Sequence, residues 1–288
     1  MARAPDGIDP AALTVVARSV LLDALAALEG HRDAIVLVGA QAVYIHTSDA
    51  DLGVPAYTSD GDLGIDPDRI GGEPLVEQAM AAAGFTRRHD LRDPQPGMWW
   101  KPADINGQPT LVEVDLMVPA ELAVGSPKKR SVSVPPHDRQ ALRRVDGLAV
   151  AMEDNTRRAI VALDPADTRT ADVRVAGVAA LLVAKAIKIS ERLDQPERRR
   201  TEKDASDVLR LMSVVRPRVV AQRFDELLTD ERVGTAAARG LRELRRLFGA
   251  ATGPGVGMAR QALVGQPSAD TAAALAPAFV AHLPDPDA

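Results

Sequence analysis

Two stretches decide the fold: LVGAQAV at residues 37–43 and YTSDGDLGID at residues 57–66. The second alternates polar and apolar residues, which is typical of a strand with one buried face. It carries Asp60 and Asp62 two residues apart, and side chains at i and i+2 of a strand point to the same face. Two carboxylates held side by side repel each other unless a cation lies between them. We therefore predict an acidic strand that binds a divalent cation, Mg²⁺ or Mn²⁺.

A buried strand is predicted upstream, at residues 34–40 (AIVLVGA), because the run is apolar and closes in a turn at Gly39. A short helix should follow this turn. The alternative interpretation of the acidic stretch is a loop, in which Asp60 and Asp62 are turn residues beside Gly61 and Gly64.

A second acidic strand is predicted at residues 110–118, within the alternating stretch PTLVEVDLMVP. It alternates so that Glu113 and Asp115 share one face and three apolar residues take the other. The Asn-Gly pair within residues 105–108 (INGQ) predicts a hairpin that joins this strand to one at residues 98–101. Asp115 would then complete a three-carboxylate metal site with the Asp-x-Asp pair.

The predicted fold class is α+β, with an N-terminal mixed sheet flanked by helices and a C-terminal helical domain. A helix is expected at residues 11–28, and further β segments at 131–134, 148–152 and 158–163. Beyond Val173 the pattern becomes helical. We therefore divide the chain into an α/β domain at residues 1–172 and a helical domain at residues 173–288 that completes the site.

Composition excludes several classes of protein. The 288 residues are 46% hydrophobic and 26% charged, as in ordinary globular proteins, and there is no cysteine for disulfides or thiolate chemistry. No apolar run reaches the roughly 20 residues that span a bilayer, and residues 1–10 lack a signal-peptide pattern, so a cytoplasmic protein without a membrane partner is expected. The net charge of −5 argues against indiscriminate nucleic-acid binding.

Two basic clusters, at residues 128–130 and, more densely, at residues 185–203, nevertheless suit a site that binds phosphate. Lys185 and Lys188 lie three residues apart in an apolar helical stretch, where a lysine needs an anionic partner, so Lys185 is expected to face phosphate. The next helix begins with Lys203, Asp204 and Asp207, and the two acids could be there simply because the helix dipole favours negative charge at a helix N-terminus. The alternative for all of these residues is a solvated helix face.

The order of these motifs resembles the nucleotidyltransferases of the AbiEii/MenT type, within the polymerase-beta-like superfamily. Gly39 corresponds to that family's first glycine, Thr58, Asp60 and Asp62 to its Thr-x-Asp-x-Asp motif, Asp115 to its later acidic strand, Lys185 to its helix lysine, and Lys203, Asp204 and Asp207 to its Lys-Asp-x-x-Asp element. The resemblance covers about residues 34–212. Ala40 and Tyr57 depart from it, because the family has a second Gly or Ser and an arginine at these places.

The resemblance implies a Mg²⁺-dependent toxin of a toxin–antitoxin pair that transfers a nucleotide from an NTP to an RNA acceptor, plausibly tRNA, and is countered by an antitoxin protein. Two alternatives stay open: nucleotide transfer to a small molecule of the aminoglycoside type, and a catalytically silent nucleotide-binding or interaction module. The residues expected to act are Asp60, Asp62 and Asp115 as metal ligands or base, Lys185 and Asp204 as further catalytic residues, and Gly39, Ser59, Lys185, Lys188 and Lys203 as nucleotide contacts.

Overall fold

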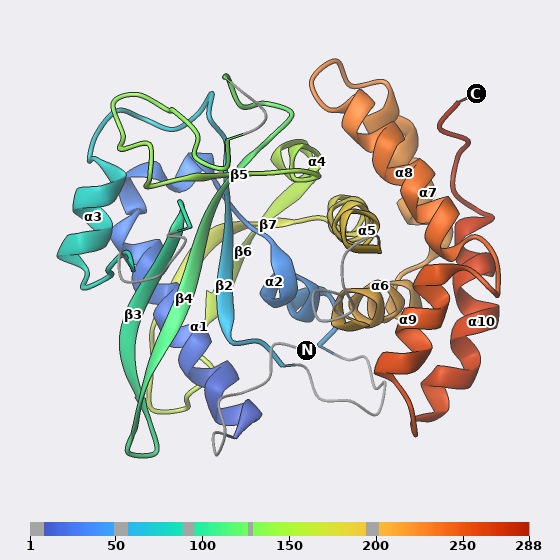
Figure 1. Cartoon of the computed structure of the whole chain (residues 1–288), viewed down its shortest axis with the longest axis horizontal. Coiled ribbons are helices and arrows are strands. Elements are labelled where there is room, and N and C mark those ends of the chain that lie inside the picture. Colours follow the sequence, from blue (N-terminus) through green and yellow to red (C-terminus); the bar gives the residue numbers. More distant parts are fainter. Residues whose placement is uncertain (1–8, 49–56, 89–94, 126–128, 194–201, 288) are drawn as a thin grey trace.

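The fold is known from a computed structural model, which describes residues 9–48, 57–88, 95–125, 129–193 and 202–287. A seven-stranded mixed sheet occupies one half of the molecule and a group of helices the other (Figure 1). The strand order is β3-β4-β2-β1-β7-β6, with β5 paired to β4. The predicted α+β class is therefore confirmed.

The strands have the following bounds: β1 Ile35–Leu37, β2 Asp60–Ile65, β3 Met98–Ile105, β4 Gln108–Pro119, β5 Arg143–Val145, β6 Asn155–Val161 and β7 Thr170–Ala176. The helices around the sheet are α1 Pro10–Ala27, the 3₁₀ helix η1 Glu29–Ala34, α2 Gly39–His46, α3 Val76–Ala82 and α4 Ala149–Glu153. The helical half consists of α5 Val178–Leu193, α6 Glu202–Val214, α7 Pro217–Leu228, α8 Gly234–Phe248, α9 Pro254–Ala262 and α10 Pro267–Val280.

The hairpin predicted from Asn106 and Gly107 joins β3 to β4. Both residues have positive φ angles, 55° and 83°, as a tight two-residue turn requires. β4 also pairs in parallel with β2, so the two acidic strands are neighbours in the centre of the sheet.

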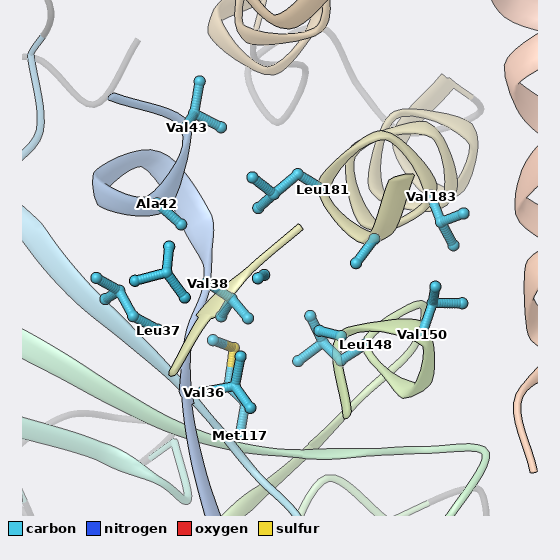
Figure 2. Packing of buried hydrophobic residues seen from close by; sticks show 14 of the residues in the cluster. Val36, Leu37, Val38, Ala42, Val43, Met117, Leu148, Val150, Leu181 and Val183 are labelled. Carbon is cyan, nitrogen blue, oxygen red and sulfur yellow. The ribbon is translucent and has the colours of Figure 1, made fainter. Parts of the chain in front are cut away.

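Helix α1 covers one face of the sheet. A Cβ placed on Gly61 would lie 3.1 Å from Leu21 of α1 and 3.5 Å from Val114 of β4. Because side chains alternate along a strand, Asp60 and Asp62 must point to the opposite face. That opposite face is where α2, α4 and α5 pack: Figure 2 shows side chains of β1, α2, α4 and α5 gathered in one apolar cluster.

The helical half is packed closely onto this layer through α5. Gly240 of α8 allows the two helices to approach, because a Cβ there would lie 2.4 Å from a methyl group of Val183 in α5. Helix α6 lies beside α2 and α9 (Figure 1). The elements that carry the predicted lysines therefore face the sheet elements that carry the predicted acids.

Some sequence predictions on secondary structure are wrong. Residues 149–153 form helix α4 rather than the predicted strand. The prediction failed because residues 148–152 are all buried, and a short apolar run without periodicity does not distinguish a helix from a strand. At residues 131–134 the chain makes a single β-bridge, from Ser131 to Arg143. Strand β7 continues to Ala176, so a division after residue 172 would cut it; the separation into two domains stays a prediction.

Helix α1 is long and apolar enough, at 18 residues with mean hydropathy 1.5, to pass a length-and-composition test for crossing a membrane. In the fold it packs on the sheet and carries the buried Arg18, whose guanidinium donates to Gln41 (2.6 Å) and to the carbonyl of Val161 (3.1 Å). It therefore serves as a core helix here, and the cytoplasmic location stays a prediction.

Candidate functional site

The centre of the site is a row of four carboxylates on the face opposite α1. Parallel pairing of β2 and β4 places Asp60 beside Glu113 and Asp62 beside Asp115. Because side chains two residues apart on a strand point to one face, all four carboxylates lie on the same face of the two adjacent strands. We call Asp60, Asp62, Glu113 and Asp115 the carboxylate face.

The glycine turn lies directly against this face. Gly39 has φ +65°, and a Cβ on it would lie 1.9 Å from Oδ2 of Asp62. The amide of Val38 donates to the carbonyl of Asp62 (3.0 Å) and the side-chain amide of Gln41 to that of Asp60 (2.9 Å). A residue without a side chain is thus required where the strand-to-helix turn meets the acidic strand.

Burial and repulsion from neighbouring carboxylates make Asp62, Glu113 and Asp115 reluctant to ionise. Burial, and then the charge of Asp60, raises the pKa of Asp62. The same causes, in the same order, raise the pKa of Glu113 to about 7. Burial also raises the pKa of Asp115, although a nearby arginine opposes this. The face therefore holds more negative charge than its surroundings compensate, which favours a bound cation.

That arginine is Arg143 of β5, which forms an ion pair with Oδ2 of Asp115. The other oxygen, Oδ1, is buried and has no hydrogen-bond partner among the described residues. Sequence reasoning missed Arg143, because it reaches the site only through the parallel pairing of β5 with β4, which has no local signal.

The second half of the site is a buried ion-pair triad on α5 and α6. Nζ of Lys185 lies 2.7 Å from Oδ1 of Asp204 and 2.7 Å from Oδ2 of Asp207. Burial alone would lower the pKa of Lys185, but the two carboxylates raise it well above its usual range. The anionic partner expected for a buried lysine is thus supplied by the protein itself.

Two further cations surround Asp204. Nζ of Lys188 lies 3.3 Å from Oδ1, and the Arg192 guanidinium lies 3.6 Å from Oδ2. The side chain of Lys188 is 45% exposed, against 7% for Lys185. Lys188 therefore remains able to reach a ligand, as a nucleotide contact must.

The remaining predicted contacts, Ser59 and Lys203, lie next to two tyrosines. Ser59 is half-buried in the bend before β2, two residues after Tyr57. Nζ of Lys203 lies 5.5 Å from the ring centre of Tyr57 and 5.9 Å from that of Tyr44. Tyr57, which departs from the resembled family, therefore faces the lysine of the Lys-Asp-x-x-Asp element.

The structure thus brings the predicted residues together in two groups. Gly39, Asp60, Asp62 and Asp115 lie around β2 and β4; Lys185, Lys188, Lys203 and Asp204 lie on α5 and α6; and Ser59 lies before β2 beside Tyr57. The residues that the predictions missed, or gave no role, are Glu113, Arg143, Asp207, Tyr44, Tyr57 and Arg210. Glu113 and Asp207 carried a signal, since each shares a face with a predicted residue two or three positions away.

A divalent cation fits Asp60 and Asp62 better than Asp115. Within the described ranges, no three His, Cys, Asp or Glu side chains stand ready as a metal-binding group. Asp115 is paired with Arg143, and the Thr58 hydroxyl donates to Oδ1 of Asp60 at 2.6 Å. The Asp-x-Asp pair still offers hard oxygen donors, which suit Mg²⁺ or Mn²⁺.

Comparison with known proteins identifies no family. No protein-family model and no curated protein matches the sequence. One similar solved structure is that of an antigenic nucleotidyltransferase-like protein from Paracoccidioides brasiliensis, with 14% identity and a TM-score of 0.41 over 80% of this chain and 94% of that chain. A likeness this weak supports no conclusion about activity, so the AbiEii/MenT resemblance stays a prediction.

Proposed function

We propose that the protein is a Mg²⁺- or Mn²⁺-dependent nucleotidyltransferase, the toxin of a toxin–antitoxin pair, that transfers a nucleotide from an NTP to an RNA acceptor, plausibly tRNA. The observation that supports the chemistry is the carboxylate face with Gly39 pressed against Asp62. The toxin role, the antitoxin partner and the RNA acceptor rest on the sequence resemblance alone.

In this proposal the carboxylate face holds the cation and receives the acceptor. Asp60 and Asp62 would hold the divalent cation, with Asp115 as third ligand or as base. The cation would neutralise the triphosphate charge. An acceptor hydroxyl oxygen then bonds to the α-phosphorus, the α–β phosphoanhydride bond breaks, pyrophosphate leaves, and the hydroxyl proton passes to Asp115 in its role as base.

The triad and the half-exposed cations would hold the triphosphate. Lys185 contributes a buried positive charge whose position is fixed by Asp204 and Asp207, while Lys188 and Lys203 can approach phosphate directly. Gly39 and Ser59 would border the triphosphate from the sheet side. This assigns acidic chemistry to the sheet and phosphate binding to the helices.

The test is transfer of label from each α-³²P nucleoside triphosphate, with Mg²⁺, onto total tRNA. We expect labelling by the wild-type chain, and a loss of at least about a hundredfold in Asp60→Asn, because removing one ligand or charge at the reacting centre costs that much in comparable sites. Asp270→Asn is the matched control, since Asp270 is exposed in the first turn of α10.

Both variants must unfold at temperatures close to wild type for the comparison to count. Labelling that is equal in wild type and Asp60→Asn would contradict the proposed site. Absence of RNA labelling, with labelling of a small hydroxylated molecule instead, would favour the aminoglycoside-type alternative. Absence of any transfer would favour the silent module.

A further inference from the structure

Beside the carboxylate face lies a pocket of about 280 Å³ between α2, α6 and α9. Its lining combines aromatic, cationic, acidic and small residues, and it includes Tyr44, Tyr57, Glu202, Lys203, Asp207 and Arg210. Sites for small ligands begin at roughly 300 Å³. The pocket therefore has room for about one nucleotide unit.

Two aromatic rings and two cations face one another in this pocket. Lys203 lies over the rings of both Tyr44 and Tyr57, and the guanidinium carbon of Arg210 lies 5.7 Å from the Tyr44 ring centre. The Tyr44 hydroxyl donates to the carbonyl of Tyr57 at 2.7 Å, which fixes the two tyrosines relative to each other. Aromatic faces beside cations are the elements with which proteins bind single-stranded nucleotides.

Lys203 is a cation in need of an anion. No carboxylate of the described part of the chain lies within ion-pair distance of its ammonium, and Asp207, which lines the same pocket, accepts a hydrogen bond from Lys185 through Oδ2 instead. Burial lowers the pKa of Lys203, although the charges of Asp207, Asp60 and Asp204 oppose this shift. A phosphate would supply the missing counter-charge.

The pocket also lies close to the carboxylate face. The charge of Asp60 is close enough to affect the pKa of both Lys203 and Tyr57. Tyr57 is joined to Asp60 through two intervening residues, Thr58 and Ser59. The pocket therefore lies near the Asp60 end of the carboxylate face.

We propose that this pocket binds one nucleotide unit, with the base stacked on the Tyr57 and Tyr44 rings and a phosphate beside Lys203. The inference rests on the proposed function and adds to it the place of base recognition. The nucleotide could come from the NTP substrate or from the 3′ end of the RNA acceptor, since both carry an aromatic base and phosphate.

The first test measures binding without turnover. Titrations with each NTP and with a single-stranded RNA trinucleotide are made on wild type, Tyr57→Leu and Tyr57→Phe, in EDTA. Losing a stacking ring weakens binding by about 5- to 150-fold, so Tyr57→Leu should show such a loss while Tyr57→Phe stays within about twofold of wild type. Equal affinity in all three proteins, or no binding by wild type, overturns the inference.

Lys203→Met provides an independent variant. It should weaken the same ligand and reduce the salt dependence of RNA binding by about one phosphate contact. Lys101→Met is the control, because Lys101 lies on β3, forms an ion pair with Asp23 of α1, and does not line the pocket. An unchanged salt slope and affinity in Lys203→Met overturns the phosphate contact.

The two sources of the nucleotide separate in the same experiment. A loss in Tyr57→Leu confined to NTP assigns the pocket to the substrate, and a loss confined to RNA assigns it to the acceptor. Failure of the proposed function is visible separately, as absence of nucleotide transfer by a wild-type chain that still binds nucleotides through Tyr57.

Discussion

Lys185→Met removes the charge at the centre of the buried triad and leaves the length and apolar stem of the side chain in place. The side chains of Lys185, Asp204 and Asp207 are 7%, 6% and 3% exposed. Removing one partner of such a buried pair costs about 3–5 kcal/mol, because the charge left behind is neither hydrated nor compensated. Lys188 still lies 3.3 Å from Asp204, so mainly Asp207 loses its partner and we expect about 3 kcal/mol.

The assay is equilibrium urea unfolding followed by circular dichroism at pH 7. At about 2 °C per kcal/mol for a chain of this size, the loss corresponds to about 6 °C in Tm. Lys188→Met is the matched control on the same helix: its side chain is 45% exposed, and an exposed pair contributes about 1 kcal/mol or less.

A double variant separates charge from packing. In Lys185→Met/Asp207→Asn the orphaned carboxylate is gone, so part of the lost stability should return although a further native residue has been changed. If Lys185→Met costs no more than Lys188→Met, or if Asp207→Asn only adds to its cost, the triad is not the buried, charge-compensated unit inferred here.

Two further predictions concern backbone conformation and pH. Gly39→Ala should lower the free energy of unfolding by about 2–4 kcal/mol, because the new Cβ would stand on a residue with positive φ and would collide with Asp62. The control is Gly107→Ala, which has φ +83° but no atom within 4 Å of the new Cβ, and which should lose only about 1 kcal/mol. Equal losses of the two variants in urea unfolding would disprove the contact between Gly39 and Asp62. Burial, and then the carboxyl of Asp146, raises the pKa of Glu191 from 4.5 to about 7, so the wild type loses stability as the pH rises between these values. Glu191→Gln should therefore gain stability relative to wild type at pH 8 but not at pH 4. The gain should be less than about 1 kcal/mol, because Glu191 is only partly buried and its exposed surface lets solvent screen the charge; an equal gain at both pH values would refute the shift.

The elements with strong local signals were predictable. The Asn106–Gly107 turn and the alternation in residues 109–119 specify the β3–β4 hairpin without reference to the rest of the chain. The common orientation of Asp60 and Asp62 follows from the strand period alone. That Asp115 lies beside them was predicted from the order of the motifs; in the structure it follows from the parallel pairing of β2 with β4.

Residues that reach the site by tertiary packing were not predictable. Arg143 meets Asp115 because β5 pairs with the C-terminal end of β4, and nothing near residue 143 indicates this pairing. Asp207 has the position of an ordinary acid near a helix N-terminus, and its role becomes visible only when α6 packs on α5 beside Lys185. Short buried runs fail for a related reason: α4 is too apolar on every side for periodicity to separate helix from strand.

The two halves of the site lie on different parts of the fold, so their separation depends on the contacts that join sheet and helices. Asp66 follows β2 directly, is buried, and accepts two hydrogen bonds from Arg232, at 2.5 and 2.9 Å, in the connection between α7 and α8. The acidic strand is thereby anchored at its C-terminal end to the helical half.

At the other end of the same strand, Lys203 of α6 lies over Tyr57, three residues before Asp60. The Arg232 pair is bidentate and largely buried, whereas a cation over an aromatic ring contributes only about 0.5–2 kcal/mol. The pocket end of the joint is therefore the weaker one. A nucleotide that stacks on Tyr57 and binds Lys203, as proposed above, would strengthen it.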